Sequence, residues 1–397
     1  MEQKQGLYDV IVAGGGVQGL STARYLAKLN VKTLLIDQFA VPHTRGSSHG
    51  KSRNIRYTYD KQHYCDMMPE AYRLWSELEK ECGQTLLTKI GIFCLRSDKL
   101  LMEMAASLKK LNIPYEFLTG EDGEKKFPGF KTGKFNGIYE QQAGVLNADK
   151  CVCSLLESFQ KLGGKFKQET LCSVNPIEEN LVQITTNKEK HFAKSLVLTC
   201  GPWTNKVLKP LGLCLPITII KTNIIYWKVK NEDCYMSSNF PLTSVGEMAS
   251  ECYATPQLDF KGLMKISYHH GVEINSPEEA FKPLNEEQSA LEKSQISLLK
   301  KYITEHYPDV IATEPSSIQP CFYSMTPDED FILDRHPRYE NIIIGAGFSG
   351  HGFKMAPVIG SLLGDLALNR KTKYSLGPFS IKRFKDKEEL ISSIENN

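Results

Sequence analysis

Apolar residues near the start of the chain recur with two different spacings, on either side of a glycine-rich turn at residues 14–19. Residues 8–13 form a short apolar run typical of a buried strand, whereas residues 20–27 place apolar side chains three and four positions apart, as a helix does. A second apolar run, residues 31–37, ends on an acid, Asp37. The pattern predicts a strand–turn–helix–strand unit of about 30 residues, the length expected of a βαβ motif.

The same spacings predict elements along the rest of the chain. Helices are expected at 64–82, 98–111, 148–162 and 286–307. Strands are expected at 86–95, at 181–200 as a hairpin, and throughout the β-branched and aromatic stretch 213–270. A buried strand, 342–344, leads into a second glycine-rich turn, 345–352, and a helix from Phe353 to about Asn369. The charged end, 382–397, is expected to fray.

The order of these elements predicts two interleaved domains. Nucleotide-type elements lie at the beginning, near 196–204 and near 342–369, and β-rich segments separate them. The predicted fold class is α/β with mixed α+β character, and a length of 397 residues suits two domains. The boundaries of the two discontinuous domains are 1–85, 145–215 and 320–397 for the first, and 86–144 and 216–319 for the second.

Composition and charge narrow the class of protein. Lys and Arg total 48 and Asp and Glu total 46, a formal net charge of +2, so the chain carries no whole-chain signal for nucleic-acid binding. Eleven cysteines are scattered without a CxxC pair, which fits neither a zinc site nor a disulfide framework. We expect reduced thiols, most of them buried, and no metal.

Targeting and membrane segments are also expected to be absent. The longest apolar stretches fall far short of the roughly 20 residues that a spanning helix needs. The N-terminus has no apolar core of the kind found in a secretory signal, and the last residues, Glu395-Asn396-Asn397, are not a peroxisomal tripeptide of the Ser-Lys-Leu type.

The first glycine-rich turn predicts a dinucleotide site. Gly14 permits the tight turn, Gly16 lets a pyrophosphate approach the backbone, and Gly19 lets the helix pack against the strand. Asp37, about 20 residues further on, suits a ribose hydroxyl. The motif itself fits NAD and FAD alike. Its position before a single βαβ unit favours FAD, because a nicotinamide domain usually continues with a second nucleotide-binding half. The second glycine-rich turn is expected to complete the cofactor site, through the residues Gly347 and Gly350.

Five separated motifs resemble one known family. They are residues 43–56, Gly201-Pro202-Trp203-Thr204, 264–271, 321–329 and 345–354. Together they resemble the monomeric sarcosine oxidase family over residues 7 to 384, and within it most closely the animal peroxisomal sarcosine and L-pipecolate oxidases. The resemblance implies an FAD-binding Rossmann-like domain and a substrate domain built on a mixed β-sheet.

The resemblance also implies a function. Members of the family oxidise secondary amino acids, such as L-pipecolate or sarcosine, to the imine and reduce O2 to H2O2. The implied partners are therefore a small secondary amino acid and O2, with no nucleic acid and no membrane, and the protein is expected to be a monomer. Peroxisomal residence is implied as well. Because the visible C-terminus lacks the peroxisomal tripeptide, the cytoplasm is the alternative.

The resemblance assigns roles to individual residues. Cys321 would bond covalently to the FAD, and Arg56 and Lys354 would bind the substrate carboxylate. Tyr253 and His269 would line the amine site. Lys265 would lie beside the flavin and activate oxygen, with His49 and Arg53 near the flavin ring.

Physical chemistry makes these roles reasonable. A covalent bond from Cys321 needs a thiolate and therefore a positive field, for which His49 and Arg53 are the candidate cations. Strand alternation puts Lys265 and His269 on one face. Three alternatives stay open: a flavin dehydrogenase of the same fold that passes electrons to another carrier, a non-catalytic flavoprotein, and a nicotinamide-linked dehydrogenase.

Overall fold

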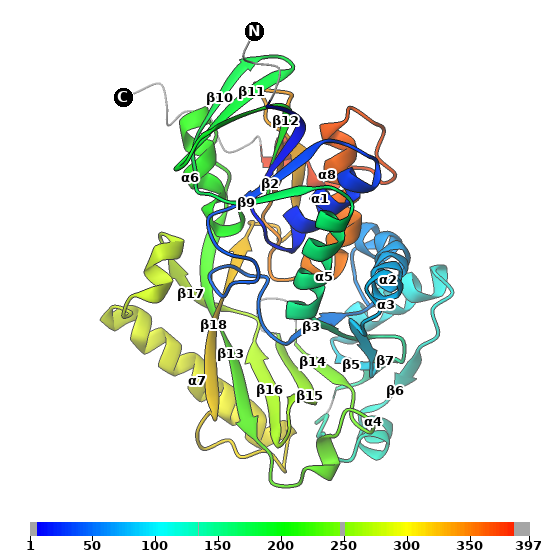
Figure 1. Cartoon of the computed structure of the whole chain (residues 1–397). Coiled ribbons are helices and arrows are strands. Elements are labelled where there is room, and N and C mark those ends of the chain that lie inside the picture. The colour runs from blue at the N-terminus through cyan, green and yellow to red at the C-terminus, as the bar shows by residue number, and fades with distance from the viewer. Residues whose placement is uncertain (1–5, 134, 247–250, 385–397) are drawn as a thin grey trace.

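A computed structural model describes residues 6–133, 135–246 and 251–384, which fold around two large β-sheets and one small one. Figure 1 shows the first large sheet in the upper half of the view, near the N-terminus, and the second in the lower half. The predicted combination of an α/β part and a mixed-sheet part is confirmed.

The first sheet contains the predicted βαβ unit. Its strand order is β10-β11-β12-β1-β2-β9, with β20 beside β12 and β19 beside β20. Strand β1 runs parallel to both β2 and β12, and helix α1 (Val17–Lys28) connects β1 to β2. The strands are β1 (Leu7–Ala13), β2 (Thr33–Asp37), β9 (Lys165–Gln168), β10 (Leu171–Glu178), β11 (Leu181–Thr186), β12 (Lys190–Leu198), β19 (Ile332–Arg335) and β20 (Ile342–Ala346).

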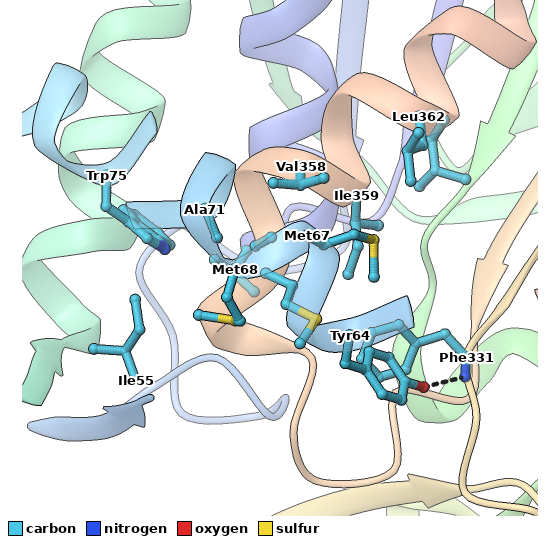
Figure 2. Packing of buried hydrophobic residues seen from close by; sticks show 14 of the residues in the cluster. Ile55, Tyr64, Met67, Met68, Ala71, Trp75, Phe331, Val358, Ile359 and Leu362 are labelled. Carbon is cyan, nitrogen blue, oxygen red and sulfur yellow. Dashed lines mark hydrogen bonds between the residues drawn. The ribbon is translucent and has the colours of Figure 1, made fainter. Parts of the chain in front are cut away.

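Helices cover this sheet and form the main apolar core. Helix α1 packs against α5 (Ala148–Lys161) and α8 (Ala356–Ala367), and α8 packs against α2 (Gln62–Cys82). Figure 2 shows Met67, Met68 and Ala71 of α2 facing Val358 and Ile359 of α8. At the end of the same cluster the Phe331 amide donates a hydrogen bond to the Tyr64 hydroxyl over 3.3 Å.

The second sheet mixes parallel and antiparallel strands. Its order is β17-β13-β16-β15-β14-β5-β7-β6, with β18 beside β13, and a small sheet, β3-β8-β4, lies apart from it. The strands of the large sheet are β5 (Ile92–Leu95), β6 (Glu116–Leu118), β7 (Gly137–Glu140), β13 (Thr218–Lys228), β14 (Leu242–Val245), β15 (Cys252–Phe260), β16 (Leu263–Tyr268), β17 (Gly271–Ile274) and β18 (Ser317–Met325). The small sheet contains β3 (Ser52–Ile55), β4 (Leu87–Lys89) and β8 (Gly144–Asn147).

Helix α7 (Glu286–His306) packs on the second sheet through Leu299 and Ile303, which join the apolar cluster around Trp227. The other helices are α3 (Asp98–Lys110), α4 (Gly120–Lys126) and α6 (Thr204–Leu208). The helices expected at 64–82, 98–111, 148–162 and 286–307 are therefore confirmed to within two residues at each end. The short strands β3, β6 and β9 were not predicted, because each has only three or four residues and little apolar character.

Two further expectations concern the cysteines and the chain ends. All eleven cysteines are free thiols, but only four of them are buried, so the expectation that most are buried was wrong. Several thiols instead lie at the edge of apolar clusters, as Cys82 and Cys200 do. The residues after 384, including the final tripeptide, lie outside the described residues. No helix in the described part of the chain combines the length and apolar character needed to cross a bilayer.

We propose that the two large sheets are the cores of the two interleaved domains, 1–85, 145–215 and 320–397, and 86–144 and 216–319. Strand β18 begins at Ser317 and pairs with β13 in the second sheet over its whole length, so the boundary placed at 320 falls inside this strand. A single strand thus leads from the second sheet back to the first.

Candidate active site

The first glycine-rich turn follows β1 directly and is built for a close approach of backbone atoms. Gly14 has a φ of 107°, and a Cβ on it would lie 2.3 Å from the carbonyl oxygen of Thr199. A Cβ on Gly19 would lie 1.8 Å from the carbonyl oxygen of Gly14. Only glycine fits at these two positions. The backbone of the turn at the N-terminus of α1 therefore carries no side chains at these two positions, and this arrangement suits a pyrophosphate.

Asp37 is fixed beside this turn at the end of β2. One carboxylate oxygen accepts a hydrogen bond from the Gly15 amide over 2.6 Å, and the other accepts from the Phe39 amide over 2.7 Å. Each oxygen keeps a second lone pair for a ligand hydroxyl. The structure thus holds Asp37 in the position that a ribose contact requires, and that contact stays a prediction.

One continuous cavity of about 420 Å³ joins the glycine-rich turn to the predicted catalytic residues. The predicted site residues that line it are Gly14, Gly16, Asp37, His49, Arg53, Arg56, Tyr253, Lys265, His269, Cys321, Gly350 and Lys354. Gly19 and Gly347 are not among the lining residues. Gly347 and Gly350 have φ values of 62° and 75°, and a Cβ on Gly350 would lie 2.6 Å from the His269 ring. The second glycine-rich turn, which lies far from the first in the sequence, therefore contacts the wall of the same cavity.

Cys321 lies on β18 with 4% of its surface exposed and faces Arg53 of β3. An Arg53 guanidinium nitrogen lies 3.7 Å from the sulfur. Hydrogen bonds to the carbonyl oxygens of Ser47, His49 and Ser52 hold that guanidinium in place. The guanidinium thus places a fixed positive charge beside the sulfur.

His49 does not contribute positive charge, contrary to the expectation from the sequence. Burial, reinforced by the charge of Arg53, lowers the pKa of His49 to about 4, so the ring is neutral at physiological pH. Its Nε2 is buried and has no hydrogen-bond partner among the described residues. A buried ring nitrogen without a partner, on a residue that lines the cavity, suits a polar ligand atom.

Lys265 of β16 is buried beside Ser52, on the same side of the cavity as Arg53. Its ammonium donates hydrogen bonds to the Ser52 hydroxyl and, over 3.2 Å, to the Ser52 carbonyl oxygen. The Ser52 hydroxyl in turn donates to Asp259 over 2.6 Å. Burial lowers the pKa of Lys265 to about 8, although the charge of Asp259 opposes the shift. We call Cys321, Arg53, Ser52, Lys265 and Asp259 the Cys321 cluster.

Arg56 and Lys354 form a second group, with Tyr59 between them. The Arg56 guanidinium carbon lies 4.8 Å, and the Lys354 ammonium nitrogen 5.3 Å, from the centre of the Tyr59 ring. Lys354 also donates a hydrogen bond to the Tyr59 hydroxyl over 2.9 Å. Burial, followed by the charge of Arg56, lowers the pKa of Lys354 to about 7.

Glu251 is the acid of this second group and was missed by the sequence analysis. It forms an ion pair with Arg96 over 3.0 Å and accepts a hydrogen bond from the Ser244 hydroxyl. Burial would raise the pKa of Glu251, but the charges of Arg96 and Arg56 outweigh it and bring the pKa to about 2. We call Arg56, Lys354, Tyr59 and Glu251 the Lys354 cluster. Its position two residues before Tyr253, directly ahead of strand β15, is the signal that could have identified it.

His269 and Tyr253 lie on the cavity wall that both clusters share. Burial lowers the pKa of His269, with Glu251 opposing the shift, so its ring is neutral. Its amide donates a hydrogen bond to the Glu251 carbonyl oxygen over 2.7 Å. Lys265 lies 6.0 Å from the centre of the Tyr253 ring.

Residues outside the cavity set the position of the Lys354 cluster. The indole of Trp75 on α2 donates a hydrogen bond to the Lys354 carbonyl oxygen over 2.8 Å. Glu140 on β7 is fully buried and accepts hydrogen bonds from the amides of Tyr57 and Thr58, just after Arg56. The sequence pattern indicated neither contact, because both join segments that lie far apart in the chain.

Comparisons with known proteins identify the family. A family model described as FAD dependent oxidoreductase matches residues 9–366. The chain belongs to this FAD-dependent oxidoreductase family.

Within the family, the chain is 39% identical to the human peroxisomal sarcosine oxidase over 97% of this chain and 98% of that protein. It is 32% identical to the monomeric sarcosine oxidase of an Arthrobacter species, over 96% of this chain and 98% of that protein. The solved structure of NikD, an amino acid oxidase of nikkomycin biosynthesis, superposes with a TM-score of 0.80 at 23% identity, covering 95% and 98% of the two chains. This last likeness shows the fold.

The residues present fit the FAD that defines the family. The glycine-rich turn leaves the close backbone approach that a pyrophosphate needs, and His49 offers a buried nitrogen without a partner. The cavity runs without interruption from that turn to Cys321 and Lys265. The protein is therefore a flavin-dependent oxidoreductase, and the residues predicted for its cofactor site and for catalysis line one cavity.

Proposed function

We propose that this protein is an oxidase of small secondary amino acids, with L-pipecolate and sarcosine as the substrates to test first. The observation that carries the proposal is that the half-buried Arg56 and the buried Lys354 line the same cavity as the predicted flavin site. Two cations that share a buried cavity suit one carboxylate, since a guanidinium binds a carboxylate through two parallel hydrogen bonds and an ammonium adds a third. The sarcosine oxidases to which the chain is similar support the same substrate class.

The remaining wall residues would then hold the amine. His269 is neutral, so its ring offers an acceptor nitrogen to a substrate N–H, and Tyr253 lies on the same wall. Bound FAD would supply the redox chemistry, accepting the two electrons released when the CH–NH group becomes C=N and passing them to O2. Lys265, buried and carrying charge below a pKa of about 8, is placed to stabilise negative charge that develops on oxygen.

We further propose that Cys321 bonds covalently to the flavin. The fixed guanidinium of Arg53 near its sulfur is the supporting observation. We also propose that the protein is a monomer and resides in the peroxisome, following the relatives named above. A fluorescent fusion that preserves the native C-terminus tests the compartment, and a cytoplasmic signal would favour the alternative.

The oxidase proposal is tested by a peroxide-coupled assay of the purified protein with L-pipecolate, sarcosine and L-proline. We expect H2O2 with at least one of them, and a KM raised about 30-fold or more in Arg56→Gln, as loss of a charge-assisted contact requires. Arg73→Gln is the matched control, because Arg73 is an exposed arginine of α2 outside the cavity. Absence of peroxide, with reduction of an artificial dye by the same substrates, would favour the dehydrogenase alternative.

The covalent bond has its own test. Yellow colour should stay with the wild-type protein after acid precipitation and be lost from Cys321→Ser. Cys200→Ser is the control, since Cys200 is a free thiol that lines the same cavity just after strand β12. Flavin that stays attached in Cys321→Ser would contradict the assignment.

A further inference from the structure

Tyr59 lies in a chain of hydrogen bonds that starts at Lys354 and ends at a backbone carbonyl. The Lys354 ammonium donates to the Tyr59 hydroxyl oxygen over 2.9 Å. That oxygen lies 3.2 Å from Nδ1 of His351, and Nε2 of His351 lies 3.0 Å from the carbonyl oxygen of Glu329. Tyr59 and Lys354 are buried, and the His351 ring is packed against Phe331 and Tyr59.

The direction of every hydrogen bond in this chain follows from its last member. A carbonyl oxygen only accepts, so Nε2 of His351 carries a proton. Burial, followed by the charge of Lys354, holds the pKa of His351 well below its usual value, so the ring is neutral and Nδ1 is an acceptor. The single hydroxyl proton of Tyr59 therefore points to His351. As a result the Tyr59 oxygen is an obligatory acceptor for Lys354.

This fixed direction limits what Lys354 offers to a ligand. Its second acceptor is the carbonyl oxygen of His351, over 3.2 Å. A neutral lysine has two N–H groups, both used by these acceptors, and would turn its lone pair to the cavity. We propose that Tyr59 and His351 are positioning residues that let Lys354 bind a carboxylate only as an ammonium, whose third N–H has no acceptor among the described residues. The inference rests on the proposed function, because a carboxylate is the ligand.

Burial and the charges around Lys354 bring its pKa into the physiological pH range, so the need for an ammonium affects binding there. The titratable groups that face it are Arg56, Tyr59, Glu251, His269 and His351. Burial first, and then Arg56, lower the pKa of Lys354 to about 7, while Glu251 opposes the shift. A bound carboxylate adds negative charge and raises this pKa. Above pH 7, binding of the carboxylate is therefore coupled to uptake of a proton.

The test uses a ligand that does not itself titrate in this range. Tetrahydropyran-2-carboxylate is an isostere of pipecolate in which a ring oxygen replaces the N–H, so it has no amine to titrate or oxidise. Its Kd for the holoenzyme is measured from the flavin absorbance at pH values on both sides of 7, and proton uptake by calorimetry in buffers of different ionisation heat. We expect a Kd that is constant below about pH 7 and rises up to about tenfold per pH unit above it, with up to about one proton taken up per ligand.

Variants identify the groups that cause the pH dependence of binding. Tyr59→Phe removes an acceptor from the ammonium and should move the midpoint of the profile down by about one pH unit, the effect of one hydrogen bond to a charged group. Lys354→Arg, which stays charged, should remove the pH dependence. Tyr72→Phe is the control, because the Tyr72 hydroxyl donates to the Gln142 carbonyl oxygen over 3.2 Å and does not line the cavity.

Three outcomes overturn the inference. They are an unchanged midpoint in Tyr59→Phe, a retained titration in Lys354→Arg, and binding by the wild type that does not depend on pH. If Tyr59→Phe does not fold, the pH dependence of binding by the wild type and by Lys354→Arg decides whether the inference holds. Absence of binding at every pH would contradict the proposed function as well, so the two failures are distinguishable.

Discussion

The Cys321 cluster and the Lys354 cluster each contain one buried lysine, but the two lysines are held differently. In the Cys321 cluster, Lys265 donates to Ser52, which donates to Asp259, so an anion lies at the end of a short hydrogen-bond path. In the Lys354 cluster, the neighbours of Lys354 are a second cation, Arg56, and a neutral phenol. The acid of that cluster, Glu251, forms its ion pair with Arg96.

The difference shows in the pKa values and suggests two uses for a buried ammonium. Burial is the main cause of both shifts, yet the pKa of Lys265 is about 8 and that of Lys354 about 7. Lys265, with its own counterion, is charged at neutral pH and suits a permanent electrostatic role. The acid near Lys354, Glu251, is paired with Arg96, so the charge of Lys354 depends more strongly on a ligand that brings negative charge. We therefore propose that the first lysine acts on oxygen and the second on the substrate carboxylate.

The largest expected effect separates the two lysines by half-reaction. Lys265→Met should slow the reaction of the reduced enzyme with O2 by about 100- to 1000-fold, the loss found when one preorganised charge is removed from a reacting centre. Reduction by substrate under anaerobic conditions should change by no more than about threefold. Stopped-flow absorbance measures both steps. Equal slowing of both would mean that Lys265 serves the substrate as well, and the comparison would fail.

The complementary change, Lys354→Met, should act on the other half-reaction and by a smaller factor. At pH 6, where Lys354 is charged, we expect carboxylate binding to weaken about 10- to 100-fold, the cost of one charge-assisted hydrogen bond. The effect should shrink above the pKa of about 7, where the wild-type lysine is already neutral. Reoxidation by O2 is the internal control and should stay at the wild-type rate. A loss of affinity that is equal at all pH values would show that Lys354 binds without its charge.

The sequence predicts those parts of the site whose signal is local. The turn that follows β1 needs glycine at positions 14 and 19 for steric reasons that involve neighbouring backbone, and the spacing to Asp37 comes from one βαβ unit. The elements around the site follow from the same local periodicity. Cys321 and Lys354, by contrast, have no distinctive local pattern, and only the resemblance to a family assigned them roles.

The partners that tune these residues could not be predicted. Tyr59 and Lys354 are 295 positions apart, and Ser52 and Asp259 are 207 apart, so no period or motif links them. The neutral state of His49 was missed for the same reason, because it depends on burial by distant segments. Charge states arise from tertiary packing, and a list of basic residues in the sequence therefore overstates the positive charge of the cavity.

The smallest expected effect tests whether the anion of the Cys321 cluster is what separates the two lysines. Asp259→Asn keeps an acceptor for the hydroxyls of Ser52 and Tyr226 but removes the charge that raises the pKa of Lys265. Because the ammonium is the form that assists oxygen, the rate of reoxidation falls as pH rises through this pKa, and a lower pKa moves that fall from about pH 8 to lower pH. Partial exposure of Asp259 screens its charge, so we expect a shift of at most about one pH unit, or three- to tenfold slower reoxidation at pH 8. Asp309→Asn, a partly exposed aspartate outside the cavity, is the control. A profile identical to wild type would mean that Lys265 keeps its charge without Asp259, and that this anion is not what separates the two lysines.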